Sequence, residues 1–176
     1  MKHSFLRIIL LTITLSSAIC RAEQLPVTHN FASMSSNSKI IYTGGNTVGT
    51  TDLLTYTCSD GASFGSQCCG AGAAICINFP HKNDKVTLSP CDSLAGIAIE
   101  YYAETLAIDN FEIRLSKDGT NWSAPLETTY HSGHTEVSFV PGRYYVRIRN
   151  KSSQKNAIPI MTYTFGACNC NIYLSE

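Results

Sequence analysis

Cysteine is the residue whose type and spacing most suggest chemistry in this chain. Thiolates could hold a metal ion, form a redox centre or pair as disulfides. Seven cysteines follow residue 22: Cys58, Cys68, Cys69, Cys76, Cys91, Cys168 and Cys170. The spacings C-C, C-x6-C and C-x-C fit no standard zinc knuckle, and the C-x-x-C pattern of thioredoxin-like centres is absent. We therefore expect disulfides, with no metal and no cofactor.

The disulfide connectivity does not follow from the sequence. A hairpin between residues 73–79 and the next strand would bring Cys76 close to Cys91. Cys58 would then pair with Cys68 or its neighbour Cys69, and a cysteine of the C-N-C tail would pin that tail. Seven thiols cannot all pair within one chain, so the remaining one is free or links two chains in a disulfide-bonded dimer.

The first 22 residues have the layout of a secretory signal peptide. They begin with basic residues, continue with an apolar run at residues 8–15 and end in small residues, with cleavage expected after Ala22 or Ala18. That run is too short to cross a bilayer, and we expect no membrane span. Lipid anchoring at Cys20 is the less favoured alternative, because the residue before it is not small. The sequence thus predicts a secreted or cell-envelope protein, in the periplasm or at the cell surface, where disulfides persist.

The mature chain is mildly acidic. Removing Lys2, Arg7 and Arg21 lowers the number of basic residues below the 13 acidic ones. This balance argues against nucleic acid as a partner, and no block of like charge suggests a membrane surface.

The distribution of apolar residues predicts an all-β fold. Short apolar or alternating segments, rich in Ile, Val, Thr, Tyr and Phe, occupy residues 53–57, 73–79, 85–89, 96–103, 111–116, 135–140, 143–150 and 158–165. Their spacing is typical of an antiparallel β-sandwich or jelly roll with little helix.

Turn signals and composition set the expected organisation. Asp-Gly in residues 117–121 predicts a tight hairpin, and Pro-Gly in residues 140–143 predicts a type II turn between two strands. Residues 23–52 are polar, with an edge strand expected at about 27–32 and then at 39–43. Residues 53–176 would form the disulfide-stapled sandwich, in one domain with residues 23–52.

Period-two alternation gives residues 96–103, 111–116 and 143–150 one inward apolar face and one solvent face, and it places Glu112 and Ser116 on the solvent face. Aromatic and basic side chains also lie on that face. A flat ring flanked by hydrogen-bond donors suits a sugar, whose C–H face stacks on the ring. The candidate ligand-binding residues are Trp122, Tyr102, Tyr145, Arg114 and Arg147, with Arg149 nearby. The simpler alternative is that these are ordinary exposed strand residues and that Trp122 packs on the sheet.

Signals for catalysis are weak. The H-S-G-H segment at 131–134 lacks a third zinc ligand and a base, and solvated loop histidines explain it better. G-x-S-x-G, P-loop and dinucleotide motifs are absent. No catalytic residue is assigned. Glycoside hydrolysis stays an alternative, because the two carboxylates that it needs can lie far apart in the sequence and meet only in the folded chain.

The succession of strands from residue 53 to 165 resembles small jelly-roll modules of bacterial secreted and surface proteins. LTYTCSDGASFG, ICINFPHKNDKVTLSP, VPGRYYVRIRNKSS and PIMTYTF carry this resemblance. Such galactose-binding-like modules often accompany polysaccharide-degrading enzymes such as pectate lyases, which implies carbohydrate binding without fixing any residue. We therefore expect a secreted, non-catalytic module that binds a glycan. The alternatives are an adhesin, inhibitor or assembly subunit that binds a surface protein, or an enzyme with an unrecognised carboxylate pair.

Overall fold

The computed structural model describes residues 26–31, 48–50, 54–65, 75–105 and 107–166, and these residues form antiparallel strands without an α-helix. The strands are β1 (Val27–Asn30), β2 (Val48–Thr50), β3 (Thr55–Ser59), β4 (Ser63–Gly65), β5 (Cys76–Phe79), β6 (Lys85–Ala103), β7 (Phe111–Ser116), β8 (Thr129–His131), β9 (His134–Asn150) and β10 (Asn156–Phe165). The expected antiparallel β-sandwich with little helix is confirmed.

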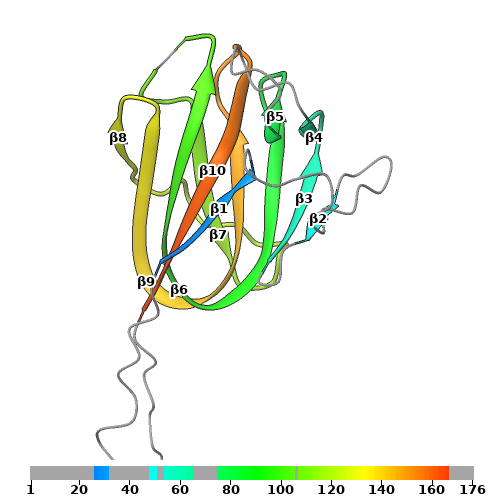
Figure 1. The fold of residues 1–176 in the computed structure, drawn as a ribbon. Coiled ribbons are helices and arrows are strands. Elements are labelled where there is room, and N and C mark those ends of the chain that lie inside the picture. Colours follow the sequence, from blue (N-terminus) through cyan, green and yellow to red (C-terminus); the bar gives the residue numbers. More distant parts are fainter. Residues whose placement is uncertain (1–25, 32–47, 51–53, 66–74, 106, 167–176) are drawn as a thin grey trace, which may run out of the picture.

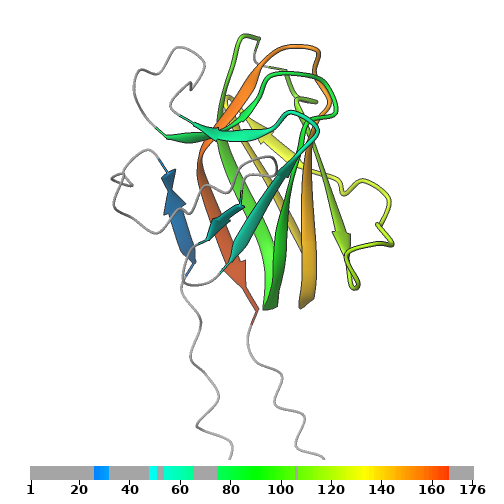
Figure 2. The ribbon, with the colours of Figure 1, turned by 90° about the vertical axis from the view of Figure 1, so that its right-hand side faces the viewer.

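Two long strands, β6 and β9, pair with each other and run through both layers of the sandwich (Figure 1). Residues 85–88 of β6 pair with 146–149 of β9, and this half joins β2, β3 and β7 in one layer. Residues 96–100 of β6 pair with 134–138 of β9, and this half joins β8 and β10 in the other layer. β1 and β5 extend that second layer from β10, as Figure 2 shows for β1, and β4 pairs with β5.

The Pro-Gly pair does not form the predicted turn. Pro141 and Gly142 lie inside β9, which continues across them, and Gly142 does not have a positive φ. On β6 the pairing shifts register three times between Leu88 and Gly96, opposite this part of β9. Irregular pairing bends both strands here. One backbone position in a bulge has no hydrogen-bond partner on the neighbouring strand, so proline, which has no N–H to donate, is tolerated there. The residues that suggested a turn therefore mark the bend from one layer to the other (Figure 1).

The core lies between the two layers. Alternate residues of β6 and β7 point inward as predicted, and Ile97, Ile99 and Ile113 are buried. The ring of Phe111 on β7 lies 5.2 Å, between centroids, from the ring of Phe79 on β5 and the same distance from that of Tyr101 on β6, which ties the layers together. Edge-to-face packing of this kind adds to the hydrophobic stabilisation of a core.

The predicted hairpin between β5 and the following strand is wrong. β5 pairs with β10 and β4, whereas β6 pairs with β3, β9 and β10. The chain leaves β5 through residues 80–84 and crosses to the other layer. The short distance in sequence suggested a hairpin. Instead, β5 and the start of β6 lie in different layers, and each buries its apolar face against the core between the layers.

A chain of polar groups connects β1, β3 and β10 inside the core. Nδ1 of His29 is hydrogen-bonded to the hydroxyl of Tyr56, which is in turn hydrogen-bonded to the hydroxyl of Tyr163. All three side chains are buried, and Phe31 packs beside them. Burial lowers the pKa of His29 below its ordinary value of 6.5, because the charged imidazolium loses its hydration.

The end of the sandwich away from the bend is closed by buried amides. Nδ2 of Asn150 donates to the carbonyls of His81 (3.0 Å) and Gln154 (3.1 Å), and its Oδ1 accepts from Nδ2 of Asn156 (2.8 Å). These bonds satisfy loop carbonyls that would otherwise be buried without partners.

Cys58 does not form the predicted disulfide. It is a free thiol on β3, 1% exposed, and belongs to the hydrophobic core. Burial raises its pKa to about 12. β3 alternates strictly, so the position of Cys58 in the strand directs the side chain inward, away from the surface loops.

Cys76 is disulfide-bonded, and Cys58, which is free, is not its partner. The pairing with Cys91 therefore stays a prediction.

Other expectations lie outside the described residues. They concern the signal peptide, the lipid anchor at Cys20, the strand at 39–43, Cys68 and Cys69, and the tail with Cys168 and Cys170. The expected strand near residues 27–32 is present as β1. The described part of the chain holds no helix long and apolar enough to cross a membrane.

We expect acid to weaken the fold through His29. Its lowered pKa means that the unfolded chain binds the proton more readily, so the contribution of neutral His29 to the free energy of unfolding is complete above pH 6.5 and decreases as the pH falls below 6.5. Urea unfolding of the wild type and of His29→Phe, at pH 7.5 and pH 5, measures this difference. Equal pH dependence of the two proteins would contradict it.

Cys58 should react with alkylating agents only when the protein unfolds. Its buried thiol with a pKa of about 12 supplies almost no thiolate at pH 8. Iodoacetamide followed by peptide mass spectrometry should find Cys58 unmodified in buffer and modified in 8 M urea, with the urea sample as the positive control. Rapid labelling of the native protein would show that the site is accessible.

Candidate functional site

The outward side of β7 and of the second half of β9 gathers the charged and aromatic side chains that the sequence singled out. Arg114 of β7 is directly paired with Arg147 of β9, and Glu112 with Arg149. Ser116 is paired with Tyr145, which lies two residues from Arg147 and so shares its face. We call Glu112, Arg114, Tyr145, Arg147 and Arg149, together with Trp122, the arginine face.

Glu112 organises this face. Its Oε1 accepts a hydrogen bond from Nε of Arg114 (2.6 Å), and its Oε2 accepts one from Nη2 of Arg149 (2.7 Å). The side chain of Glu112 is 7% exposed, so the predicted solvent-facing position is buried beneath its two partners. Burial by itself raises the pKa of Glu112, but the hydrogen bonds and charges of the two arginines outweigh it and hold the pKa below 4.5.

Arg147 occupies the middle of the face without an ion pair among the described residues. Its guanidinium carbon lies 4.2 Å from the centre of the Trp122 ring, a cation–π contact. Burial, followed by the neighbouring charges of Arg114 and Arg149, lowers its pKa, and the charge of Glu112 opposes this shift. Trp122 therefore packs on the sheet as the simpler alternative expected, but it does so against a cation.

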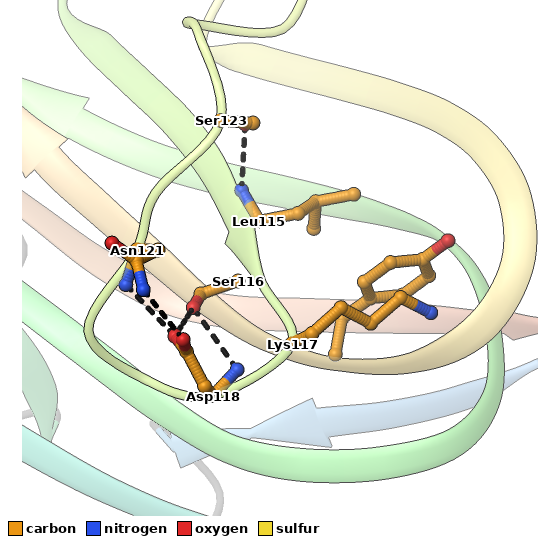
Figure 3. A pocket seen from close by; sticks show the side chains of 7 residues that line it. Leu115, Ser116, Lys117, Asp118, Asn121 and Ser123 are labelled. Atoms are coloured by element: carbon orange, nitrogen blue, oxygen red, sulfur yellow. Dashed lines mark hydrogen bonds between the residues drawn. The ribbon is translucent and has the colours of Figure 1, made fainter.

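The Asp-Gly turn positions Trp122. Gly119 has φ +76°, so the predicted need for positive φ is confirmed. As Figure 3 shows, Asp118 points into the loop, where its Oδ1 accepts hydrogen bonds from Ser116 Oγ (2.9 Å) and the backbone N–H of Asn121 (2.8 Å), and its Oδ2 from Asn121 Nδ2 (2.7 Å). These bonds, led by those from Asn121, hold the pKa of Asp118 well below 3.8.

The segment after the turn runs back along β7. The backbone N–H of Ser123 donates to the carbonyl of Leu115 (2.9 Å), Ser123 Oγ accepts from the N–H of Leu115 (3.1 Å, Figure 3), and the N–H of Leu126 donates to the carbonyl of Ile113 (3.0 Å). Arg114 Nη1 also donates to the carbonyl of Ser123 (3.2 Å). The loop that carries Trp122 is thus fixed at both ends to the strand that carries Arg114.

A pocket of about 370 Å³ lies beside the same loop. It is lined by Leu115, Ser116, Lys117, Asp118, Asn121, Ser123 and Tyr144 (Figure 3). Nζ of Lys117 lies 4.0 Å from the centre of the Tyr144 ring. Tyr144 and Tyr145 point to opposite sides of β9 because strand neighbours alternate, and Gly119 approaches the Tyr145 ring. Tyr144 therefore lines the pocket, whereas Tyr145 belongs to the arginine face.

Tyr102 does not belong to this site. It lies near the end of β6, where its backbone is paired with Ala157 of β10 in the other layer. Its side chain is 44% exposed and lines a separate pocket of about 360 Å³ with Glu100, Tyr101, Ala103, Ser132, Gly133 and Pro159. The solvent-facing position of Tyr102 was predicted, but its strand segment is not a neighbour of β7, so it does not meet the other candidate residues.

The two histidines of the H-S-G-H segment flank a carboxylate. Nε2 of His131 lies 3.9 Å from one carboxylate oxygen of Glu136, and Nε2 of His134 lies 3.7 Å from the other. His131 and Glu136 are largely exposed, and the described residues contain no group of three or more side chains that could hold a metal ion.

The central role of Glu112 was missed by the sequence analysis. The available signal was its place on the outward side of β7, two residues from Arg114, where an acidic residue can meet basic ones. The partner across the strand, Arg149, could be found only from the register of β7 against β9.

Glu112→Gln should destabilise the fold by about 1–3 kcal/mol, because it removes the carboxylate from two charge-assisted hydrogen bonds in a buried position. The difference in the free energy of unfolding between the wild type and Glu112→Gln should decrease as the pH falls below 4.5. The pKa of Glu112 in the folded protein lies below that value, so the stabilisation by its ionised carboxylate is lost in acid. Urea unfolding at pH 7 and pH 3.5 measures both effects. Asp92→Asn, which breaks the exposed pair with Arg143, is the control and should change stability by less than about 0.5 kcal/mol.

Comparison with known proteins gives matches at the level of structure only. No protein-family model matches the sequence, and no curated protein matches it. A low-affinity xylan-binding module, CBM86, from Roseburia intestinalis is similar with a TM-score of 0.39 and 6% identity, over 65% of this chain and 96% of the module. CBM32-1, from a family 31 glycoside hydrolase of Clostridium perfringens, is similar with a TM-score of 0.37 and 13% identity, over 81% of this chain and 96% of that one. At these scores we transfer neither a ligand nor a binding residue to this protein.

Proposed function

We propose that this protein is a secreted, non-catalytic carbohydrate-binding module and that the arginine face is its ligand-binding surface. The observation that carries the proposal is the arrangement of Trp122, Tyr145, Arg114 and Arg147, which come from a loop and two strands and meet on one side of the sheet. Four of the five predicted ligand-binding residues thus gather in one place.

The chemistry of the face suits a sugar ring. The half-buried indole of Trp122 offers an apolar surface for the C–H groups of a pyranose, and guanidinium N–H groups donate hydrogen bonds to its hydroxyls. The cation–π contact with Arg147 and the hydrogen-bonded loop hold the indole in place before a ligand arrives. A prearranged aromatic platform loses little side-chain entropy on binding.

The carboxylates closest to the face are poorly suited to catalysis. Glu112 has both oxygens bound by arginines and a lowered pKa, so it stays ionised and is a poor general acid. Asp118 is likewise committed to hydrogen bonds within its own loop. Binding without hydrolysis is therefore the favoured role.

A glycan array probed with the purified full-length protein tests this function. We expect binding to a limited set of glycans, with Trp122→Ala weakening it about tenfold or more because the stacking platform is removed. Tyr145→Ala should weaken it less, because Gly119 already covers part of that ring. Trp122→Phe, which keeps an aromatic ring, should retain part of the affinity.

Tyr102→Ala is the matched control, because it removes an exposed tyrosine from the other layer and should leave binding unchanged. Circular dichroism confirms that each variant is folded. Silence across plant, microbial and host glycans would refute the proposal, and capture of a protein partner by the same face would favour the adhesin or inhibitor class instead.

A further inference from the structure

The arginine face holds more positive charge than its own carboxylate can balance. The charged groups that act on Arg147 are Arg114, Arg149 and Glu112, so three guanidinium groups share one carboxylate. Both oxygens of that carboxylate are already bound by Arg114 and Arg149. In the part of the chain that the structure describes, Arg147 has no ion pair and lies against the Trp122 ring.

Other basic residues near this layer find acidic partners. Nζ of Lys85 lies 2.7 Å from a carboxylate oxygen of Asp60, and Nη1 of Arg143 lies 2.9 Å from one of Asp92. Nζ of Lys151 lies 3.6 Å from a carboxylate oxygen of Asp109. These pairs are more exposed than the Glu112 cluster, where pairing would matter more. Lys117, at the exposed turn, also has no ion pair among the described residues and lies over the Tyr144 ring. Arg147 differs from Lys117 in being partly buried on the face, where an unbalanced charge costs more.

The sheet also places Arg147 at a cost to stability. Arg114 and Arg147 are directly paired across β7 and β9, and like charges opposite each other destabilise a sheet. Nε of Arg147 and Nε of Arg149 are buried without a hydrogen-bond partner among the described residues. An anion at this point would offset the repulsion and supply acceptors for guanidinium N–H groups.

We infer that the arginine face binds an acidic glycan, with a carboxylate or sulfate group of the glycan at Arg147 and its sugar ring on Trp122. This inference rests on the proposed function and names the ligand class. The guanidinium carbon lies over the indole ring. A guanidinium group carries several N–H donors in one plane, which suit a planar or tetrahedral oxyanion. A neutral sugar could also stack on Trp122, but it would leave the three guanidinium charges unbalanced.

Binding to polygalacturonate and to fully methyl-esterified polygalacturonate distinguishes charge from sugar shape, because the two polymers share a backbone. We expect at least about tenfold tighter binding of the acid form, measured by calorimetry at 50 mM NaCl, and a smaller ratio at 500 mM NaCl. Dextran sulfate against dextran repeats the comparison for sulfate and shows which oxyanion is preferred. Polyglutamate, a polyanion without sugar, should bind at least about tenfold more weakly than the preferred acidic glycan.

Arg147→Gln should remove most of the preference for the acid form, a loss of about tenfold or more, and Arg147→Lys should restore only part of it because the planar donor geometry is lost. Arg143→Gln is the matched control. It removes the same charge from the same strand, at a site paired with Asp92, and should change affinity less than about twofold.

The outcomes separate this inference from the proposed function. Equal binding of acid and ester forms, with Trp122→Ala abolishing both, would overturn the acidic ligand and keep the carbohydrate-binding function. Polyglutamate binding as tightly as the acidic glycans would also overturn the inference, because it would show simple polyanion attraction. Binding to none of the glycans would overturn both.

Discussion

The pairing of β6 with β9 is the constraint on which the rest of the structure depends. These strands, of 19 and 17 residues, pair in both halves of the sandwich, and the register shifts between Leu88 and Gly96 allow the pair to bend. Each remaining strand except β4 pairs with one of them or with a strand that does, and β4 joins the sheet through β5 and β10. Because the bend brings the inward faces of the two halves opposite each other, one strand pair creates the core and fixes which residues face solvent.

The arginine face follows from that geometry. The second half of β9 lies beside β7, and its first half lies beside β8. The alternating residues Tyr145, Arg147 and Arg149 therefore meet the outward residues of β7. Glu112 accepts a hydrogen bond from each of two guanidinium groups and fixes their positions on the face. The hydrogen-bonded loop at Asp118 then places an indole over the remaining one. In the proposed function, stability and ligand recognition share residues, and Arg147 is assigned mainly to recognition.

Local patterns predicted much of this arrangement and failed where pairing is long-range. The alternation in residues 111–116 and 143–150 gave the inward faces correctly, because it depends only on the geometry of a strand. Glu112 and Ser116 were expected to be solvent-exposed but are buried by groups from β9 and the following loop. Pro141 and Gly142 have the composition of a turn, yet a bulged bend accommodates the same residues. Cys58 was counted among the disulfides because composition does not show that its side chain points into the core.

The sequence by itself determined the all-β class, the inward faces of the main strands and the identity of most side chains in the candidate site, because period-two alternation and residue type are local properties. Only the tertiary structure decided which of those side chains meet. It separated Tyr102 from Trp122 by placing them in different layers, and it brought Glu112 against Arg149 through the register of β7 and β9. The physical reason is that strand order and register arise from burial of the whole core, which no short segment encodes.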